Sequence, residues 1–313
     1  MKAGHRNLLI AAIAVLALFV GWRVIGQMQA ERYAQTDPAR ALRWRPDDPR
    51  ALLALAERQL AQGDTDGAQA SARRLLAQEP LQGEAFRILA AASDKRGDRA
   101  EAFRLYKIAA RRAQLEPLAT SLDAPIRPER VVQSLNRLLP DDAVVCADPG
   151  TPCPYFSAYY DVSRPGRHFI TNRAHGALGF SMSAALGAWV GRPNAKCVSV
   201  MGDGSFGFTV GELETIVRHK APLLMIVFSN SVYGWIKASQ KAGYDKRYYS
   251  VDFDRTDHAR IAEAYGVKAW RVEDPAKLDA AIKAAMEHDG PALIDVVAQP
   301  LQDAAAPVSQ WMG

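Results

Sequence analysis

Apolar positions along the chain follow three successive patterns. Residues 8–22 form one run without a charged residue, and residues 27–113 carry apolar and small residues at helical spacing. The remainder alternates helical stretches with short apolar runs. Alternation of this last kind is typical of a parallel sheet covered by helices. The pattern therefore predicts an N-terminal apolar segment, an all-α region and an α/β domain.

The N-terminal run has the composition of a membrane anchor. Its 15 residues rise about 22 Å as a helix, short of a hydrocarbon core of ~30 Å. Arg23 can extend its side chain to the interface, which lets Val24-Ile25 lengthen the span. A cleaved signal peptide should end in a small-x-small site, and Met28-Gln29-Ala30 is a poor candidate. We expect a retained single-pass helix over residues 1–26 in a bacterial inner membrane; balanced flanking charges leave the side of the C-terminal domain open.

A 34-residue period runs through the helical region, residues 27–113. Eight positions repeat: Pro46 as Pro80, Ala51 as Ala85, Leu52 as Phe86, Leu55 as Leu89, Ala56 as Ala90, Gly63 as Gly97, Asp64 as Asp98 and Ala68 as Ala102. Each unit is expected to form a helix, a Gly-Asp turn and a second helix, and so resembles the tetratricopeptide repeat. This resemblance implies either a groove that binds a protein partner or a helical spacer, and both interpretations stay open.

Prolines interrupt the helical pattern after residue 113. Glu116-Pro117, Ala124-Pro125 and Arg127-Pro128 disfavour helix, so residues 114–128 are predicted to be a linker. Residues 129–313 are expected to form a doubly wound parallel α/β domain. The expected strands are 143–147, 197–201, 223–228, 268–272 and 292–297, and the expected helices are 128–139, 174–190, 210–219, 257–265 and 275–287.

Two expected strands end in residues that suit a metal ion. One ends in Gly202-Asp203-Gly204, whose glycines allow a tight turn and a close approach to a ligand, and the next ends at Asn230. A right-handed strand–helix–strand crossover brings both ends to one edge of the sheet. A carboxylate, an amide oxygen and a backbone carbonyl form a partial oxygen shell that Mg²⁺ accepts when phosphate oxygens complete it. The pattern therefore predicts magnesium between the protein and a diphosphate.

The same residues resemble the thiamine diphosphate fingerprint of acetolactate synthases. Gly202-Asp203-Gly204 and Asn230 have the family's spacing, and Ser205-Phe206 lies between them as in the family. The resemblance implies that the metal is bound by Asp203, Asn230 and the carbonyl of Val232. It also places Gly202, Gly204, Ser205, Tyr233 and Gly234 at the cofactor.

Two upstream segments are similar to the family in position. The first, 173–180, corresponds to the loop that receives the aminopyrimidine, which assigns Gly176 and Leu178, with Leu where acetolactate synthases usually carry Met. His175 in this loop either touches substrate or cofactor or caps the following helix. In the second segment, 148–152, Gly150 stands where the family has a glycine, but Thr151-Pro152 replaces the family's Gln-His pair. This departure leaves the cofactor contact to Thr151 and puts the family's usual substrate, pyruvate, in doubt.

The resemblance covers residues 127–307 and implies an enzyme subunit. A full acetolactate synthase has three α/β domains, and the first supplies a glutamate that activates the cofactor. We do not expect that first domain in this sequence, because residues 1–113 are predicted to be an anchor and a helical repeat. We therefore expect a thiamine diphosphate- and Mg²⁺-dependent 2-oxo acid decarboxylase or carboligase whose glutamate comes from another chain or from a second copy. The alternative is a membrane-tethered tetratricopeptide interaction protein with a catalytically inactive remnant of the cofactor domain.

Charge and cysteine content agree with this interpretation. The chain has 39 Lys+Arg and 34 Asp+Glu, a formal net charge of +5, and its basic residues are dispersed over helices. Dispersed charge favours solvated helix faces over nucleic-acid binding. Cys146, Cys153 and Cys197 have neither disulfide nor zinc spacing and are expected to be buried small apolar residues.

Overall fold

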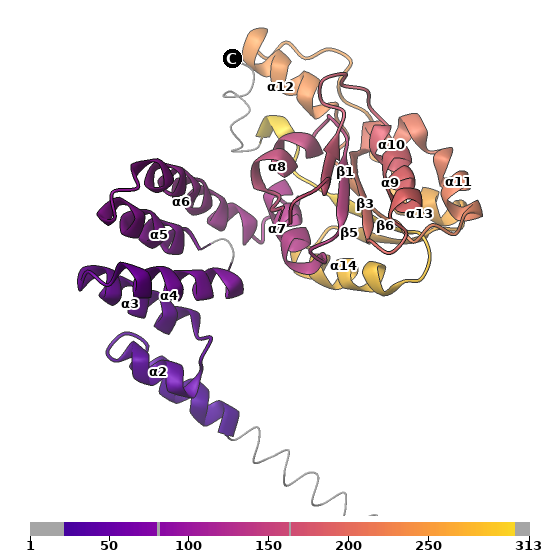
Figure 1. Cartoon of the computed structure of the whole chain (residues 1–313). Helices are drawn as coiled ribbons and strands as arrows, with labels where there is room; N and C mark the ends of the chain where they lie inside the picture. Colours follow the sequence, from indigo (N-terminus) through magenta and orange to yellow (C-terminus); the bar gives the residue numbers. More distant parts are fainter. Residues whose placement is uncertain (1–21, 80–81, 163, 304–313) are drawn as a thin grey trace, which may run out of the picture. The chain divides into compact units, whose positions relative to one another are not determined.

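The computed structural model describes residues 22–79, 82–162 and 164–303. The predicted anchor, 1–26, falls almost wholly outside these residues, and within them no helix has the length and apolar content needed to cross a bilayer. The chain divides into two compact units, Met1–Glu116 and Pro117–Gly313. Figure 1 shows the helices of the first unit and the sheet of the second.

The described part of the first unit is built from helices. They are α2 (Pro38–Trp44), α3 (Pro49–Ala61), α4 (Thr65–Gln78), α5 (Gly83–Lys95) and α6 (Arg99–Ala119). The starts of α3 and α5, and those of α4 and α6, have the 34-residue separation of the sequence repeat. The predicted helix–turn–helix units are confirmed, while their membership of the tetratricopeptide class stays a prediction.

The Gly-Asp pairs of the repeat form the turns between paired helices. Gly63 and Gly97 have φ of 81° and 82°, a left-handed conformation that glycine adopts without strain. Asp64 caps α4 by accepting a hydrogen bond from the Gly67 N–H at 2.9 Å, and Asp98 accepts one from the Glu101 N–H at 3.1 Å. The glycine thus ends one helix and the aspartate begins the next.

Helix α6 continues into the predicted linker. It ends at Ala119 with Pro117 inside it, so the prediction that residues 114–119 are not helical was wrong. Pro117 lies in the last turn, where a proline removes only one intrahelical hydrogen bond and the helix ends two residues later. The boundary between the two units falls at this proline.

The second unit contains one six-stranded parallel sheet. Its strands are β1 (Val144–Ala147), β2 (Phe169–Thr171), β3 (Cys197–Gly202), β4 (Leu224–Ser229), β5 (Lys268–Val272) and β6 (Ala292–Val297), in the order β2-β1-β3-β4-β6-β5. Helices α7 (Pro128–Leu138), α8 (Pro152–Tyr159) and α14 (Leu278–Glu287) pack on one face, and α9 (Phe180–Gly191), α11 (Glu212–Arg218) and α13 (His258–Ala264) pack on the other (Figure 1). The predicted parallel α/β architecture is confirmed. Both faces of the central strands are buried, which explains their continuous apolar runs.

Some elements differ from the prediction. The helix expected over 174–190 begins only at Phe180, because Gly176 and Gly179 have φ of 75° and 85°, which a helix cannot include. Sequence patterns missed β2, α8, α10 (Asp203–Thr209) and the short 3₁₀ helices Pro275–Lys277 and Leu301–Asp303. Helix α12 (Gly234–Gly243) was also not among the expected helices.

The strand order creates a crevice at the carboxyl ends of β1 and β3. Strand β1 pairs with β2 on one side and with β3 on the other, so the connections that leave this region run in opposite directions. In open α/β sheets, ligands bind at such a switch point. The fold therefore directs attention to the residues that follow β1 and β3.

Candidate functional site

A cavity of about 320 Å³ lies at the switch point. Every residue predicted to bind the cofactor lines it: Gly150, Thr151, Gly176, Leu178, Gly202, Gly204, Ser205, Tyr233 and Gly234. Asp203 and Val232, two of the predicted metal ligands, also line it. The sequence analysis did not assign the remaining lining residues, Pro149, Pro154, Arg173, Trp235 and Ile236.

Three helices begin at this cavity. Thr151 precedes α8, Gly202 precedes α10 and Tyr233 precedes α12, and each of these residues lines the cavity. The first N–H groups of a helix have no intrahelical partner, and the helix dipole adds partial positive charge at that end. In the first three residues of α8 only Cys153 has an N–H, because Pro152 and Pro154 have none, so the starts of α10 and α12 supply most of the donors that suit an anion such as a diphosphate.

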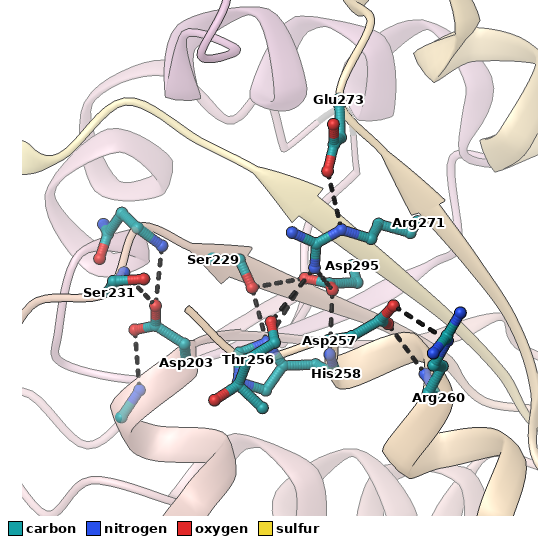
Figure 2. Close-up of polar contacts among 12 residues, drawn as sticks. Asp203, Ser229, Ser231, Thr256, Asp257, His258, Arg260, Arg271, Glu273 and Asp295 are labelled. Atoms are coloured by element: carbon teal, nitrogen blue, oxygen red, sulfur yellow. Dashed lines mark hydrogen bonds and ion pairs between the residues drawn. The ribbon is translucent and has the colours of Figure 1, made fainter. Parts of the chain in front are cut away.

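Asp203 is held by backbone donors and is 4% exposed. Its Oδ2 accepts hydrogen bonds from the Asn230 N–H at 2.7 Å and the Ser231 N–H at 2.6 Å, and its Oδ1 accepts one from the Gly204 N–H at 2.8 Å (Figure 2). Burial raises the pKa of Asp203, and these backbone N–H groups oppose the rise only in part. The carboxylate is thus fixed in position, and a bound cation would favour its ionised form.

The loop after β4 holds two further oxygen atoms, on Asn230 and Val232; Val232 lines the cavity, whereas Asn230 is not among the lining residues. Both polar atoms of the Asn230 side chain, Oδ1 and Nδ2, are buried and lack a hydrogen-bond partner among the described residues. A buried polar group without a partner costs about 1–3 kcal/mol. The carbonyl of Val232 also accepts no hydrogen bond within the described part of the chain. An unpaired amide and a free carbonyl beside a carboxylate fit the oxygen shell of Mg²⁺.

The loop before α9 contributes unevenly to the cavity. A Cβ added to Gly150 would lie 3.6 Å from Leu178 Cδ2, so this apolar side chain packs directly over the segment that follows β1. The guanidinium carbon of Arg173 lies 5.9 Å from the centre of the Trp235 ring. His175 is exposed and is not among the lining residues, so the structure does not bring it to the other predicted site residues.

Two buried polar groups behind the cavity were missed by the sequence analysis. Asp148, at the end of β1, accepts hydrogen bonds from the N–H groups of Gly179 and Ser181, at 3.3 Å and 3.0 Å, and thereby holds the start of α9. Burial raises its pKa. The second group joins Ser229, His258 and Asp295, which share no spacing that a sequence pattern could reveal. The available signals were Ser229 at the end of β4, His258 at the start of α13 and the carboxylate of Asp295 inside the otherwise apolar strand β6.

Comparisons with known proteins agree with this geometry. Residues 148–296 match the family described as thiamine pyrophosphate enzyme, C-terminal TPP binding domain. A probable acetolactate synthase large subunit of Methanococcus aeolicus is 32% identical over 184 residues, which cover 57% of this chain and 31% of that protein. Acetolactate synthase of Bacillus subtilis is 36% identical over 169 residues, covering 54% and 29%.

A solved structure is similar in fold and sequence. The thiamine diphosphate-dependent 4-hydroxybenzoylformate decarboxylase of Rhodococcus jostii superposes with a TM-score of 0.55 and 26% sequence identity, over 59% of this chain and 34% of that one. The second unit therefore matches the C-terminal cofactor-binding domain of thiamine pyrophosphate enzymes over residues 148–296. Within that class, its sequence relatives are acetolactate synthases. The chain spans about a third of the length of the curated relatives it matches.

Proposed function

We propose that this chain is a thiamine diphosphate- and Mg²⁺-dependent subunit of the acetolactate synthase type, which decarboxylates a 2-oxo acid or transfers the resulting carbanion to an acceptor. The observation that supports it best is the convergence of three helix starts on one cavity, beside an aspartate and an unpaired asparagine. These features lie within residues 148–296, which match the cofactor-binding family.

In this proposal the chain's residues divide the work of holding the cofactor. The N–H groups at the starts of α10 and α12, together with the N–H of Cys153 in the first turn of α8, would bind the diphosphate. Asp203, Asn230 and the Val232 carbonyl would bind Mg²⁺, and Leu178 would support the cofactor's rings. Thiamine diphosphate, when bound, supplies an electron sink for the carbanion that forms when carbon dioxide leaves a 2-oxo acid. The protein positions the reactants and excludes water.

The activating carboxylate is proposed to come from another polypeptide or from a second copy of the chain. Among the described residues that line the cavity, Asp203 is the sole carboxylate, and it is assigned to the metal. We also propose that residues 1–26 anchor the chain in a membrane and that the helical repeat binds a protein partner.

A second candidate function gives the repeat the leading role. The chain would then be a membrane-tethered interaction protein whose cofactor domain is catalytically inactive. The absence of a glutamate from the described cavity lining and the replacement of the Gln-His pair by Thr151-Pro152 favour this alternative.

Calorimetric titration separates the two candidates. The full chain, in detergent micelles, is titrated with thiamine diphosphate in the presence and absence of Mg²⁺, alongside Asp203→Ala and the matched control Asp254→Ala, which removes an exposed carboxylate. We expect Mg²⁺-dependent binding by the parent and by Asp254→Ala, and at least tenfold weaker binding by a folded Asp203→Ala. A folded parent that does not bind the cofactor with Mg²⁺ would favour the inactive-domain alternative.

A further inference from the structure

A second cavity, of about 720 Å³, adjoins the cofactor cavity. The two share Asp203, Gly204 and Tyr233 as common lining residues. Aromatic side chains form much of the remaining wall, among them Phe206, Phe208 and Phe253. Such walls favour a planar apolar molecule, because aromatic rings gain from stacked and edge-to-face contacts. The proposed function assigns no role to this cavity.

One buried histidine lies in the wall of the second cavity. His258 is 6% exposed, and its Nδ1 lies 2.7 Å from the Oγ of Ser229. The same Oγ lies 2.5 Å from Oδ1 of Asp295. The other oxygen of Asp295, Oδ2, accepts hydrogen bonds from the Arg271 guanidinium at 2.6 Å and from the His258 backbone N–H at 3.1 Å (Figure 2).

The direction of these hydrogen bonds follows from the charge of Asp295. Burial acts to raise its pKa, but hydrogen bonds from His258 and Ser229, the charge of His258 when its ring is protonated, and the charge of Arg271 outweigh burial and lower it. An ionised carboxylate only accepts hydrogen bonds, so the Ser229 hydroxyl donates its proton to Asp295. The Ser229 oxygen then accepts the Nδ1–H of His258. In the neutral ring this places the lone pair on Nε2.

The lone pair on Nε2 has no hydrogen-bond donor within the described part of the chain. The ring is held on one side by Phe206, which meets it edge-on at 5.4 Å between ring centres and an interplanar angle of 85°. Ser229 holds the Nδ1 edge of the ring. Ring rotation is therefore restricted, and the cavity offers a fixed acceptor among aromatic side chains.

We propose that this second cavity binds a small planar organic molecule that carries one O–H or N–H donor, such as a phenol or an aromatic amine, and that the donor bonds to Nε2 of His258. The aromatic walls receive the ring of the molecule, and His258 selects for the donor. The chain of Asp295, Ser229 and His258 serves to hold the acceptor in the correct tautomer. Neither Mg²⁺ nor thiamine diphosphate takes part in this binding.

Two probes with the same ring, of which only one has a hydrogen-bond donor, test this site. Phenol and its methyl ether, anisole, have the same ring, and only phenol has an O–H. The full chain, with ¹⁵N-labelled histidine and without Mg²⁺ or cofactor, is titrated with each probe while the imidazole nitrogens are followed by NMR; the variant His258→Phe assigns the His258 signals. We expect phenol to shift the Nε2 signal of His258 and to bind about two- to tenfold more tightly than anisole, the value of one hydrogen bond.

Two variants complete the test. His258→Phe should bind phenol no more tightly than anisole, with its affinity for anisole unchanged. Phe208→Ala changes a side chain that is 65% exposed, so it should fold normally, and it should bind both probes more weakly while it keeps the preference for phenol. Equal affinity of the parent for the two probes, binding without a shift at His258, or no binding of either probe by the folded parent would each overturn the proposal. Because the titration omits the cofactor, its outcome does not depend on the proposed enzymatic function.

Discussion

Glu129 in α7 provides a sharp test of how burial controls the stability of the second unit. Its side chain is 0% exposed, and both carboxyl oxygens lack a hydrogen-bond partner among the described residues. Burial raises the pKa of Glu129, while the nearby N–H of its own backbone, which does not reach hydrogen-bond geometry, and the charge of Arg127 oppose the rise. The substitution Glu129→Gln keeps the shape of the side chain and removes its titration.

The sign of the effect follows from proton linkage. An unfolded glutamate has a pKa of about 4.3, and the folded pKa is higher, so the folded state binds more protons between the two values. The stabilisation from protonated Glu129 is fully present below the unfolded pKa and is lost as pH rises through the folded pKa. Its size is ~1.4 kcal/mol for each pH unit that separates the unfolded pKa from the folded pKa. Glutamine lacks this dependence. We expect parent and variant to have similar stability near pH 4, and the variant to be more stable by about 1–3 kcal/mol at pH 8.

Hydrogen exchange measured by mass spectrometry suits this comparison, because it follows peptides of the β1–β6 sheet separately from the helical unit. The free energy of unfolding of the sheet is measured at a series of pH values for the parent, Glu129→Gln and Glu263→Gln, which changes an exposed glutamate of α13. A difference between Glu129→Gln and parent that is independent of pH, or a less stable variant at pH 8, would refute the reasoning.

Three further predictions concern single side chains. Gly204→Ala adds a Cβ that would lie 2.5 Å from Tyr233 Cε1 and must displace that ring, so calorimetry should show at least tenfold weaker binding of thiamine diphosphate. The control is Gly207→Ala, whose Cβ meets nothing within 4 Å. Equal affinities of the two variants would contradict the prediction. Asp64→Ala removes the side chain that caps α4 and should destabilise the helical unit by about 0.5–2 kcal/mol, measured by hydrogen exchange of α4 peptides; unchanged protection would show that the cap is dispensable. Burial raises the pKa of Cys146 to about 12, so this thiol should resist iodoacetamide at pH 8 in the native chain and react after unfolding in urea. Labelling is measured by mass spectrometry. Rapid labelling of Cys146 in the native chain would count against its burial.

The sequence predicted the sheet well where strands are buried on both faces. The run 292–297 coincides with the observed β6, and the run 197–201 covers all but the last residue of β3, because predominantly apolar stretches bounded by polar residues have few other structures available. The edge strand β5 also lies where it was predicted, at 268–272. Strand β2 was missed because it is short and lies at the sheet edge, where half-buried positions give no clear period. Helix α10 was missed because Gly-Asp-Gly favours a turn by propensity, whereas hydrogen bonds from the Asn230 loop to Asp203 fix its start.

For the site, residues that belong to one local sequence pattern could be predicted, whereas contacts between distant segments could not. The proximity of Asp203 and Asn230 could be predicted because they lie at a fixed spacing across one strand–helix–strand unit, and the glycines next to Asp203 mark the turn. The contacts of Asp148, and the group formed by Ser229, His258 and Asp295, depend on pairings between segments that lie far apart in the chain. Such pairings exist only once the sheet order is set. The predicted membrane anchor lies outside the described residues and stays a prediction.

Tyr233 forms part of the wall of both cavities, and its ring packs against Gly204, which is also common to both. A molecule that moves this ring from one side changes the space available on the other. If both proposed ligands bind, each would alter the affinity of the other by the same factor. The shared position of Tyr233 thus links the two proposals, because a ligand that displaces its ring in one cavity would change the shape of the other.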